Sequence, residues 1–270
     1  MKPLHIISLG AGVQSSTMAL MAAKGLIGPA PDAAIFADTG AEPANIYRYL
    51  NYLEKLLPFP VYRVMWKEGL QKNIEAAVKG SRLASAPFYT ESDGKREGQL
   101  RRQCTREFKI QPIERKMREL VGLKFGQRAK KGEVLAECWQ GISTDEIQRA
   151  RKGLEGWQQV RYPLIEQRMS RSDCLRWMAA NGYEKPTKSA CTWCPYHDDA
   201  AWRDQKNNDP ESWAQSVAMD KLIRGGWRGT TQKLYLHRSL KPLSEIDFRN
   251  AKDMGQLDAF EAECEGMCGL

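Results

Sequence analysis

Short apolar runs alternate with stretches of helical periodicity along the first half of the chain. Leu4–Ser8 (LHIIS), Ala33–Ala37 (AAIFA) and Val61–Met65 have the composition of buried strands, whereas Ser15–Lys24 and Ile46–Leu57 carry apolar residues at helical spacing. Parallel strands cannot be joined by tight hairpins, so strands that alternate with helices of this length indicate crossover connections. The pattern predicts an α/β fold with an open, doubly wound, mostly parallel sheet.

The same periodicity continues beyond a polar interruption. Residues 80–105 are rich in Ser, Gly and charged side chains, which is typical of a mobile surface loop. A helix is expected over Glu107–Leu120 and a strand within Glu133–Ile142. A further helix is expected over Ser170–Asn181, capped by Ser170 and ended by Gly182.

The strand-and-helix pattern weakens after about residue 185, where a pair of cysteines and several helices and loops follow. We therefore predict an α/β domain over residues 1–185 and a smaller helical, cysteine-bearing region over residues 186–270. A chain of 270 residues with 42% hydrophobic side chains can bury a core of this size.

The charge balance favours anionic partners. The chain has 41 Lys and Arg against 33 Asp and Glu, a net charge of +8, which suits nucleotides, sulfate esters or nucleic acid, although an ordinary solvated surface is the alternative. No segment approaches the roughly 20 apolar residues that cross a bilayer, and the first residues lack a secretory pattern. A cytoplasmic protein without membrane contact is expected, in which the seven cysteines are thiols or metal ligands.

A glycine-containing loop follows the first predicted strand. Residues 8–17 (SLGAGVQSST) lie where a strand becomes a helix, so their backbone N–H groups and the helix N-terminus would point at an anion. A purely structural turn is the alternative. The loop has neither the GxxxxGK[ST] spacing of a Walker loop nor the GxGxxG spacing of a dinucleotide-binding fingerprint, which disfavours kinases and dehydrogenases.

This loop resembles the PP-loop of the PAPS reductase and ATP pyrophosphatase superfamily of adenine nucleotide α hydrolases. Gln14 stands where the pyrophosphatases usually have an aspartate, and in this respect the loop is closer to the reductases. The sequence Asp38-Thr39-Gly40 after the second strand is similar to the DTG segment of the same reductases; alternatively, Asp38 and Thr39 merely cap a helix. The resemblance implies a nucleotide-binding set comprising Ser8, Gly10, Ala11, Gly12, Val13, Gln14, Ser15, Ser16, Asp38, Thr39, Gly40, Gly141 and Arg149.

Two later segments extend the resemblance to roughly residues 4–195. Arg101–Pro112 is similar to the family segment in which a cysteine precedes a basic helix, and Trp139–Ala150 is similar to the motif after a later strand. The resemblance implies that Ser15, Arg106 and Lys109 act on the reacting groups. Guanidinium and ammonium groups are suited to clamping phosphate or sulfate oxygens, but each could equally be part of a solvated face.

Four of the cysteines are candidate metal ligands. Cys191 and Cys194 form a CxxC pair, which alone could serve zinc, an iron–sulfur cluster or thiol exchange. In the adenylyl-sulfate reductases and the DNA phosphorothioation ATP pyrophosphatases, a cysteine near the basic segment joins such a pair around a [4Fe–4S] cluster. This resemblance implies Cys104, Cys191 and Cys194 as ligands, with Cys268 favoured over Cys264 as the fourth and zinc as the competing metal.

Three functions follow from these motifs. The first is an ATP pyrophosphatase, with Mg²⁺ as a further cofactor, that adenylates a substrate for sulfur transfer, with nucleic acid as substrate and a separate sulfur donor. The second is a thiol-dependent reductase of PAPS or adenylyl sulfate that uses thioredoxin. The third is a nucleotide-sensing or nucleic-acid-binding module without catalysis, which the glutamine at position 14 would suit.

Overall fold

The computed structural model describes residues 2–82, 85–124, 126–151, 153, 155–226 and 232–249. The chain forms two compact units. The first contains residues 1–67 and 106–190, and the second contains residues 68–105 and 191–270. The sequence-based boundary after residue 185 lies near the change of unit after Ala190, whereas residues 68–105, which we expected in the α/β domain, belong to the second unit.

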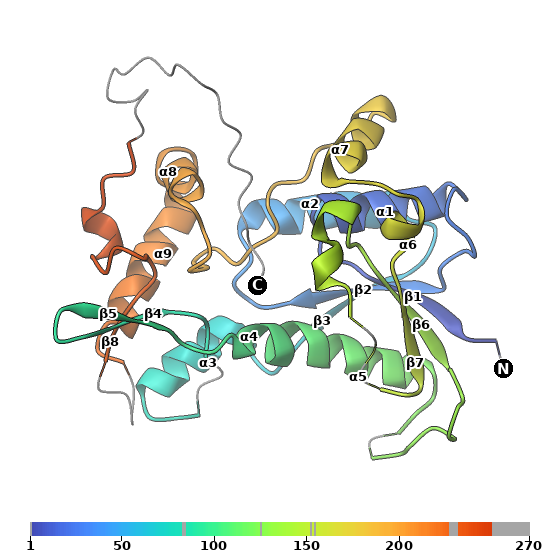
Figure 1. Ribbon diagram of the computed structural model, residues 1–270, viewed down its shortest axis with the longest axis horizontal. Coiled ribbons are helices and arrows are strands. Elements are labelled where there is room, and N and C mark those ends of the chain that lie inside the picture. Colours follow the sequence, from blue (N-terminus) through green and yellow to red (C-terminus); the bar gives the residue numbers. More distant parts are fainter. Residues whose placement is uncertain are drawn as a thin grey trace. The chain divides into compact units, whose positions relative to one another are not determined.

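The described part of the first unit contains one parallel five-stranded sheet with the order β3-β2-β1-β6-β7 (Figure 1). Three strands coincide closely with the predicted apolar runs, and the doubly wound, parallel α/β class is confirmed. The polar edge strand β7 was not predicted. The strands are β1 (Leu4–Ser8), β2 (Ala33–Asp38), β3 (Val61–Met65), β6 (Ala136–Gln140) and β7 (Gln158–Arg161).

Helices cover both faces of this sheet (Figure 1). One face carries α1 (Val13–Ala23), α2 (Ala44–Leu56), α6 (Pro163–Glu166) and α7 (Arg171–Ala180), and α1 contacts the other three. The opposite face carries α5 (Gln111–Leu120), which contacts β2 and β3. Crossovers on both faces are the defining feature of a doubly wound sheet.

Alternate residues of each strand enter different cores because side chains of a strand alternate between its two faces. Ile7 and Phe36 belong to the core beneath α1 and α2, whereas Ile6 and Ile35 belong to the core beneath α5. All four side chains are at most 2% exposed. Burial on both faces explains why these strands read as continuous apolar runs rather than as alternating patterns.

Two helices of the first unit begin in contrasting ways. At α7, the Ser170 hydroxyl accepts a hydrogen bond from Asp173 N and the Asp173 carboxylate accepts one from Ser170 N, which completes a capping box and confirms the predicted start. At α1, Gly12 occupies the N-cap position, and no side chain accepts a hydrogen bond from the first turn. The helix predicted over Glu107–Leu120 begins with a π-helical turn, η1 (Arg106–Ile110), and continues as α5.

The second unit contains an antiparallel sheet with the order β5-β4-β8 in its described residues. The prediction of an irregular loop over residues 80–105 was wrong, because β4 and β5 form a hairpin there. Asp93 (φ 52°) and Gly94 (φ 75°) supply the two left-handed residues that a tight hairpin requires. The hairpin was not predicted because the sequence of β5, KREGQ, is polar and lacks the apolar pattern of a strand. The elements are α3 (Gly69–Val78), β4 (Tyr89–Ser92), β5 (Lys95–Gln99), α4 (Gln103–Thr105), α8 (Asp199–Asn208), α9 (Pro210–Ile223), β8 (Lys233–Tyr235) and η3 (Leu243–Glu245).

The buried Asp220 connects elements of the second unit. Its carboxylate accepts hydrogen bonds from Leu236 N at 2.9 Å and Leu243 N at 3.0 Å, and it pairs with the Arg224 guanidinium. The Arg224 guanidinium in turn lies over the Tyr235 ring, 3.6 Å from its centroid. These contacts attach β8 and η3 to the end of α9, which places the carboxylate in a structural role.

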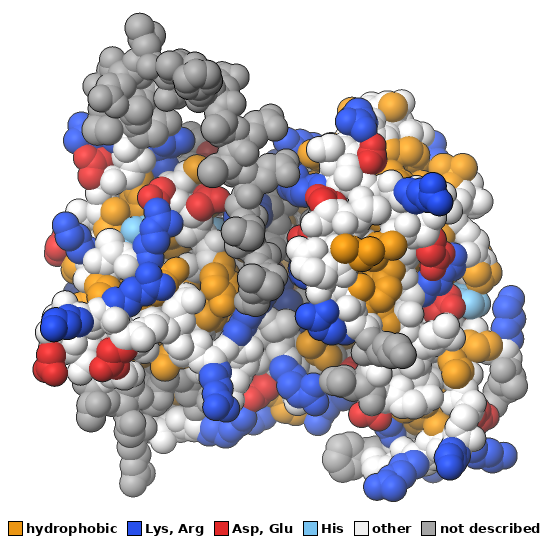
Figure 2. Space-filling model, viewed as in Figure 1, with side chains coloured by type: hydrophobic (Ala, Val, Ile, Leu, Met, Phe, Trp, Pro, Cys, Tyr) orange, Lys and Arg blue, Asp and Glu red, His pale blue; other side chains and the backbone are white. Residues whose placement is uncertain are grey.

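Lys and Arg side chains are distributed over the face shown in Figure 2 and alternate there with Asp and Glu. The positive net charge on this face is therefore spread out rather than gathered in one block. Among the described helices, none combines the length and the apolar character that crossing a bilayer would require.

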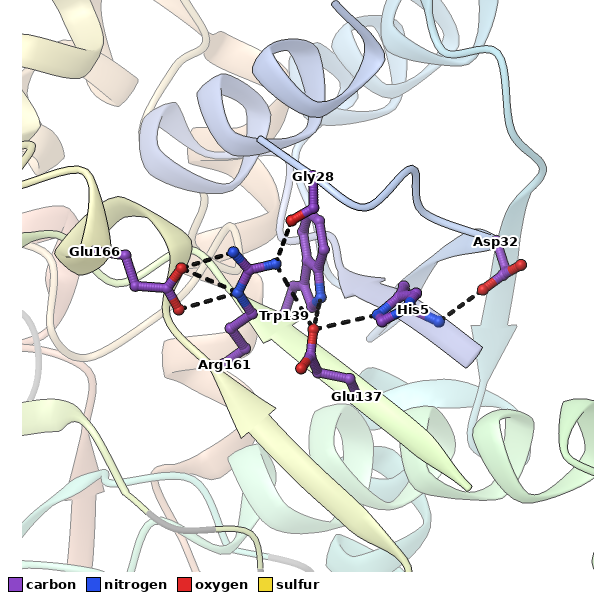
Figure 3. Close-up of polar contacts among 7 residues, drawn as sticks. All are labelled: His5, Gly28, Asp32, Glu137, Trp139, Arg161 and Glu166. Carbon is purple, nitrogen blue, oxygen red and sulfur yellow. Dashed lines mark hydrogen bonds and ion pairs between the residues drawn. The ribbon is translucent and has the colours of Figure 1, made fainter. Parts of the chain in front are cut away.

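A polar network joins β1, β6 and β7 on one side of the sheet (Figure 3). Glu137 lies at its centre and accepts a hydrogen bond from Trp139 Nε1 at 2.7 Å. The same carboxylate oxygen lies 3.2 Å from His5 Nδ1 and 3.7 Å from an Arg161 guanidinium nitrogen. Arg161 also forms a bidentate pair with Glu166 of α6 and lies over the Trp139 ring. The Glu137 carboxylate thus contacts side chains from three adjacent strands, which include its own strand β6.

We expect Glu137→Ala to lower the free energy of unfolding by about 2–3 kcal/mol, because it leaves the buried indole N–H without its acceptor and removes a charged partner of Arg161. Urea denaturation followed by tryptophan fluorescence measures this loss. The exposed Glu119, whose carboxylate pairs with Lys116, provides the control, and Glu119→Ala should cost less than about 1 kcal/mol. Equal losses in the two variants would contradict a central role for Glu137.

Candidate anion site at the carboxyl edge of the parallel sheet

The order of the parallel strands identifies where a ligand can enter. From β1 the chain proceeds through α1 to β2 and β3 on one side, and it later returns to β6 and β7 on the other side of β1. The connections leaving β1 and β6 therefore diverge, and in open α/β sheets ligands bind in the crevice outside such a point. All of the predicted nucleotide-binding residues belong to the unit that contains this sheet.

The loop between β1 and α1 has a defined backbone shape. Ala11 has φ 52°, which is unusual for a residue other than glycine and is a form of strain that clusters at functional sites. The Ser15 hydroxyl accepts a hydrogen bond from Gly10 N at 3.1 Å and lies 3.3 Å from the Gly12 carbonyl oxygen, to which it donates. The Ser189 hydroxyl donates to the Gly10 carbonyl. Ser15, predicted as a reacting residue, thus also holds the loop in this shape.

The start of α1 offers backbone hydrogen-bond donors. The first turn contains Val13, Gln14 and Ser15, includes no acidic residue, and has no side-chain cap. Amides in the first turn of a helix lack intrahelical acceptors, and the helix dipole adds a partial positive charge there. The hydroxyl-bearing side chain of Ser16, in contrast, is fully buried. This end of α1 can therefore bind an anion such as a phosphate group.

Gly141 is required by a close backbone approach. A Cβ atom at this position would lie 2.6 Å from Ser15 Cα and 2.7 Å from Ser15 N. The loop after β6 therefore passes directly against the first turn of α1, as the predicted role of Gly141 in the site requires. Gly12 is less constrained, since its Cβ would lie 3.3 Å from Ser189 Cβ.

Side chains bridge the same two loops. Gln14 Nε2 lies 3.3 Å from Glu146 Oε2 and 3.5 Å from Ser143 Oγ. The other oxygen of Glu146 pairs with Arg149 at 2.7 Å, within η2 (Thr144–Arg149). Gln14 therefore acts as a hydrogen-bond donor to a carboxylate, and the predicted nucleotide-facing Arg149 is held by that same carboxylate.

The end of β2 supplies a second group of polar residues. Asp38 Oδ1 accepts hydrogen bonds from Gly40 N at 2.8 Å and from the Tyr47 hydroxyl at 2.7 Å. Gly40 has φ 66°, which suits glycine. Thr39 is 1% exposed, and its hydroxyl donates to Glu42 Oε1 at 3.1 Å. The predicted DTG segment thus forms a tight turn in which one Asp38 oxygen caps the backbone.

The two predicted cations of the basic segment have different surroundings. Lys109 Nζ lies 3.3 Å from the carboxylate of Glu42, next to the DTG turn. Arg106 is exposed, and its charge opposes the burial that raises the pKa of Glu114 on α5. The structure thus brings Lys109 to the end of β2, whereas the interaction that it gives for Arg106 is with α5.

Three residues of this site were not predicted as functional. Glu42 and Glu146 follow the carboxyl ends of β2 and β6, and this placement at one edge of a parallel sheet is the signal that could have identified them. Ser189 gave no such signal, because 179 residues separate it from Gly10. Glu42 pairs with Lys109 and Glu146 pairs with Arg149, whereas the backbone amides of α1 have no acidic partner in their own turn.

The described cysteines fall into two groups. Cys138 and Cys174 lie in the first unit, where burial raises their thiol pKa to about 12 and about 11 respectively, so they are inert core residues. Cys104, Cys191 and Cys194 belong to the second unit. Cys268 and Cys264 lie outside the described residues.

Two of the predicted metal ligands, Cys104 and Cys194, affect the same aromatic residue. Burial raises the pKa of Tyr196, with Cys194 and Cys104 adding to the shift and Arg102 opposing it. Cys194 N also donates to the Cys191 carbonyl at 3.0 Å in the turn of the CxxC pair. Within the described ranges, however, no three Cys, His, Asp or Glu side chains are gathered as metal ligands.

Comparisons with known proteins add little to this geometry. No protein-family model and no curated protein matches the chain. Among solved structures, the chain is similar to a PAPS reductase from Candida auris in a phosphate complex, with 14% sequence identity and a TM-score of 0.44. The match covers 69% of this chain and 76% of that one. This likeness is too weak to assign a function, so the site is interpreted from its own residues.

Replacement of Gly141 tests the close approach of the two loops. Gly141→Ala should lower the free energy of unfolding by about 1–3 kcal/mol, because its Cβ must displace the backbone of Ser15. Gly156 is the matched control in the same unit, since a Cβ there meets nothing within 4 Å and its φ is not in the left-handed region. Thermal and chemical denaturation of the two variants give the comparison, and comparable stabilities would show that the loops do not touch as described.

Proposed function

We propose that this chain is a PP-loop ATP pyrophosphatase-like enzyme, which binds an adenine nucleotide and adenylates an oxygen of its substrate. The observation that carries the proposal is the uncapped, acid-free start of α1 at the point where the connections of β1 and β6 diverge. Backbone amides there suit the polyphosphate of a nucleotide. The resemblance of residues 8–17 and 38–40 to the motifs of that superfamily supports the choice of adenine nucleotide.

The proposed reaction follows from where charge develops. A substrate oxygen attacks the α-phosphorus of ATP, the bond from that phosphorus to the bridging oxygen breaks, and pyrophosphate leaves with the electron pair. The amides of Val13, Gln14 and Ser15 would stabilise the charge on the departing pyrophosphate, with Lys109 as a nearby cation. The fixed shape of the loop means that these donors need little reorganisation. Mg²⁺ would accompany the nucleotide in solution.

The substrate class is part of the proposal. We place nucleic acid as the substrate, with Lys95–Lys131 as the segment that contacts it, because this stretch carries most of its charge as Lys and Arg. A sulfur donor would then attack the carbon or phosphorus that bears the adenylated oxygen. The bond from that atom to the oxygen breaks, AMP leaves with the oxygen and the electron pair, and a carbon–sulfur or phosphorus–sulfur bond forms. Adenylation converts a poor leaving group into a good one, which is the chemical reason for consuming ATP.

A replacement at the N-cap of α1 tests anion binding separately from folding. Gly12→Asp should bind ATP about 30- to 100-fold more weakly, because its carboxylate occupies the amide donors and repels the phosphates. Asp is a favourable N-cap, so the variant should be at least as stable as the parent. Titration calorimetry with ATP and thermal unfolding measure both quantities.

Gly12→Asn is the isosteric control for that experiment. It offers the same cap without the charge, so its affinity for ATP should fall by no more than about tenfold. Parental affinity in both variants would contradict binding at α1. Pyrophosphate release from ATP by the parent protein is required for the pyrophosphatase assignment. Sulfite formation from PAPS with thioredoxin, without pyrophosphate release from ATP, would instead indicate the reductase.

We also propose a [4Fe–4S] cluster held by Cys104, Cys191, Cys194 and Cys268, with zinc as the alternative metal, and we assign it no step in the reaction. Anaerobically purified protein should absorb in the visible range and contain about four iron atoms per chain. Cys191→Ser should lose both signals, whereas Cys174→Ser, at a buried core thiol, should retain them. Colourless protein with stoichiometric zinc would favour the alternative.

A further inference from the structure

Glu42 is a carboxylate in an unfavourable environment. Its side chain is 1% exposed, although it lies in the short connection between β2 and α2, where a glutamate could readily extend into water. One oxygen, Oε1, receives the Thr39 hydroxyl at 3.1 Å and lies 3.3 Å from Lys109 Nζ. The other, Oε2, is buried and has no hydrogen-bond partner among the described residues. A buried, incompletely satisfied carboxylate is costly and needs a functional explanation.

Stability alone does not explain the pair that Glu42 makes with Lys109. Burying a charge has a desolvation penalty that one ion pair rarely offsets, and an apolar or neutral side chain is often at least as stable in such a place. The penalty here is increased by the unsatisfied oxygen. What the pair does provide is a fixed position for the ammonium group at the end of β2.

The position of Lys109 is determined by the helical turn that carries it. It belongs to the π-helical turn η1, in which its neighbour Phe108 is 1% exposed and anchors the turn in the core. Such turns add a residue to a helix and redirect the side chains they carry. The Lys109 side chain is 36% exposed, and its ammonium group lies 3.3 Å from the buried carboxylate. A lysine has three rotatable donors on a flexible stem, and one carboxylate contact removes much of that freedom.

We propose that Glu42 is a positioning residue, which holds the Lys109 ammonium toward the anionic group of the bound nucleotide. The lysine then bridges a buried carboxylate and the ligand phosphate. This inference rests on the proposed function and adds to it a residue that does not touch the ligand. It also explains why position 42 carries a charged side chain, although the chain would fold as well with a neutral side chain there.

The test compares anion binding with binding of the uncharged nucleoside. Glu42→Gln keeps the shape and removes the charge, so ATP affinity should fall about tenfold while adenosine affinity, measured by competition, changes less than about twofold. The unfolding temperature should change little, because the charge left without its partner belongs to Lys109, whose side chain is 36% exposed to water. Glu42→Asp, which restores the carboxylate on a shorter stem, should recover part of the ATP affinity.

Lys109→Met and the double variant Glu42→Gln/Lys109→Met complete a cycle. Because Glu42 acts through Lys109, the double variant should bind ATP no more weakly than Lys109→Met alone. Additive losses would overturn the inference, as would parental ATP affinity in Glu42→Gln, or equal losses for ATP and adenosine together with a lower unfolding temperature. If the parent protein binds neither ATP nor adenosine, the proposed function fails and the inference fails with it. If the parent binds ATP and only the Glu42 results differ from expectation, the inference alone fails.

Discussion

The site depends on one close approach between two backbones, that of Gly141 and Ser15. A doubly wound sheet carries the chain away from β1 and β6 in opposite directions, which opens a crevice but leaves nothing to define its depth. The loop after β6 limits the depth of the crevice, because its backbone at Gly141 passes so close to the first turn of α1 that no Cβ fits between them. Gln14 and Glu146 can meet only because of that approach. The geometry of the amide donors therefore follows from a glycine that lies on the other loop.

Several features of the carboxyl edge of the sheet are unfavourable for stability. Elsewhere in the chain the corresponding features are favourable. The helix α7 begins with a complete capping box, whereas α1, at the centre of the same unit, begins with glycine and no cap. Ala11 has a left-handed backbone in a position where glycine would be less strained. Their concentration at one edge of the sheet is the pattern expected when local rules are broken for function.

The sequence predicts the parallel core better than its edges, for a physical reason. The strands β1, β2 and β3 are buried on both faces or lie against helices, so their apolar runs identify them directly. The edge strand β7 (QQVR) and the hairpin strand β5 (KREGQ) are polar because solvent reaches them, and composition then gives no signal. The Asp-Gly turn at Asp93 was the one local indication of the hairpin.

Motif resemblance selected residues 8–17, the DTG turn and Gly141 as candidate site residues, but it did not predict the partners that these residues contact in the structure. The Gln14–Glu146 contact spans 132 residues, and the Lys109–Glu42 pair joins a π-helical turn to a loop after a different strand. Spacing along the chain carries no information about such pairs. Together with the local Arg149–Glu146 pair, the Lys109–Glu42 pair joins two of the candidate cations to carboxylates, so the site cannot be regarded as a simple basic patch.

The division of the chain into two units adds a covalent constraint on the site. The phosphate loop is held by Ser189, and the CxxC pair begins at Cys191, two residues later and in the other unit. Arg106 and Cys104 are likewise two residues apart and belong to different units. The residues that shape the candidate anion site and those proposed to hold a metal are thus neighbours along the backbone, although they belong to different units.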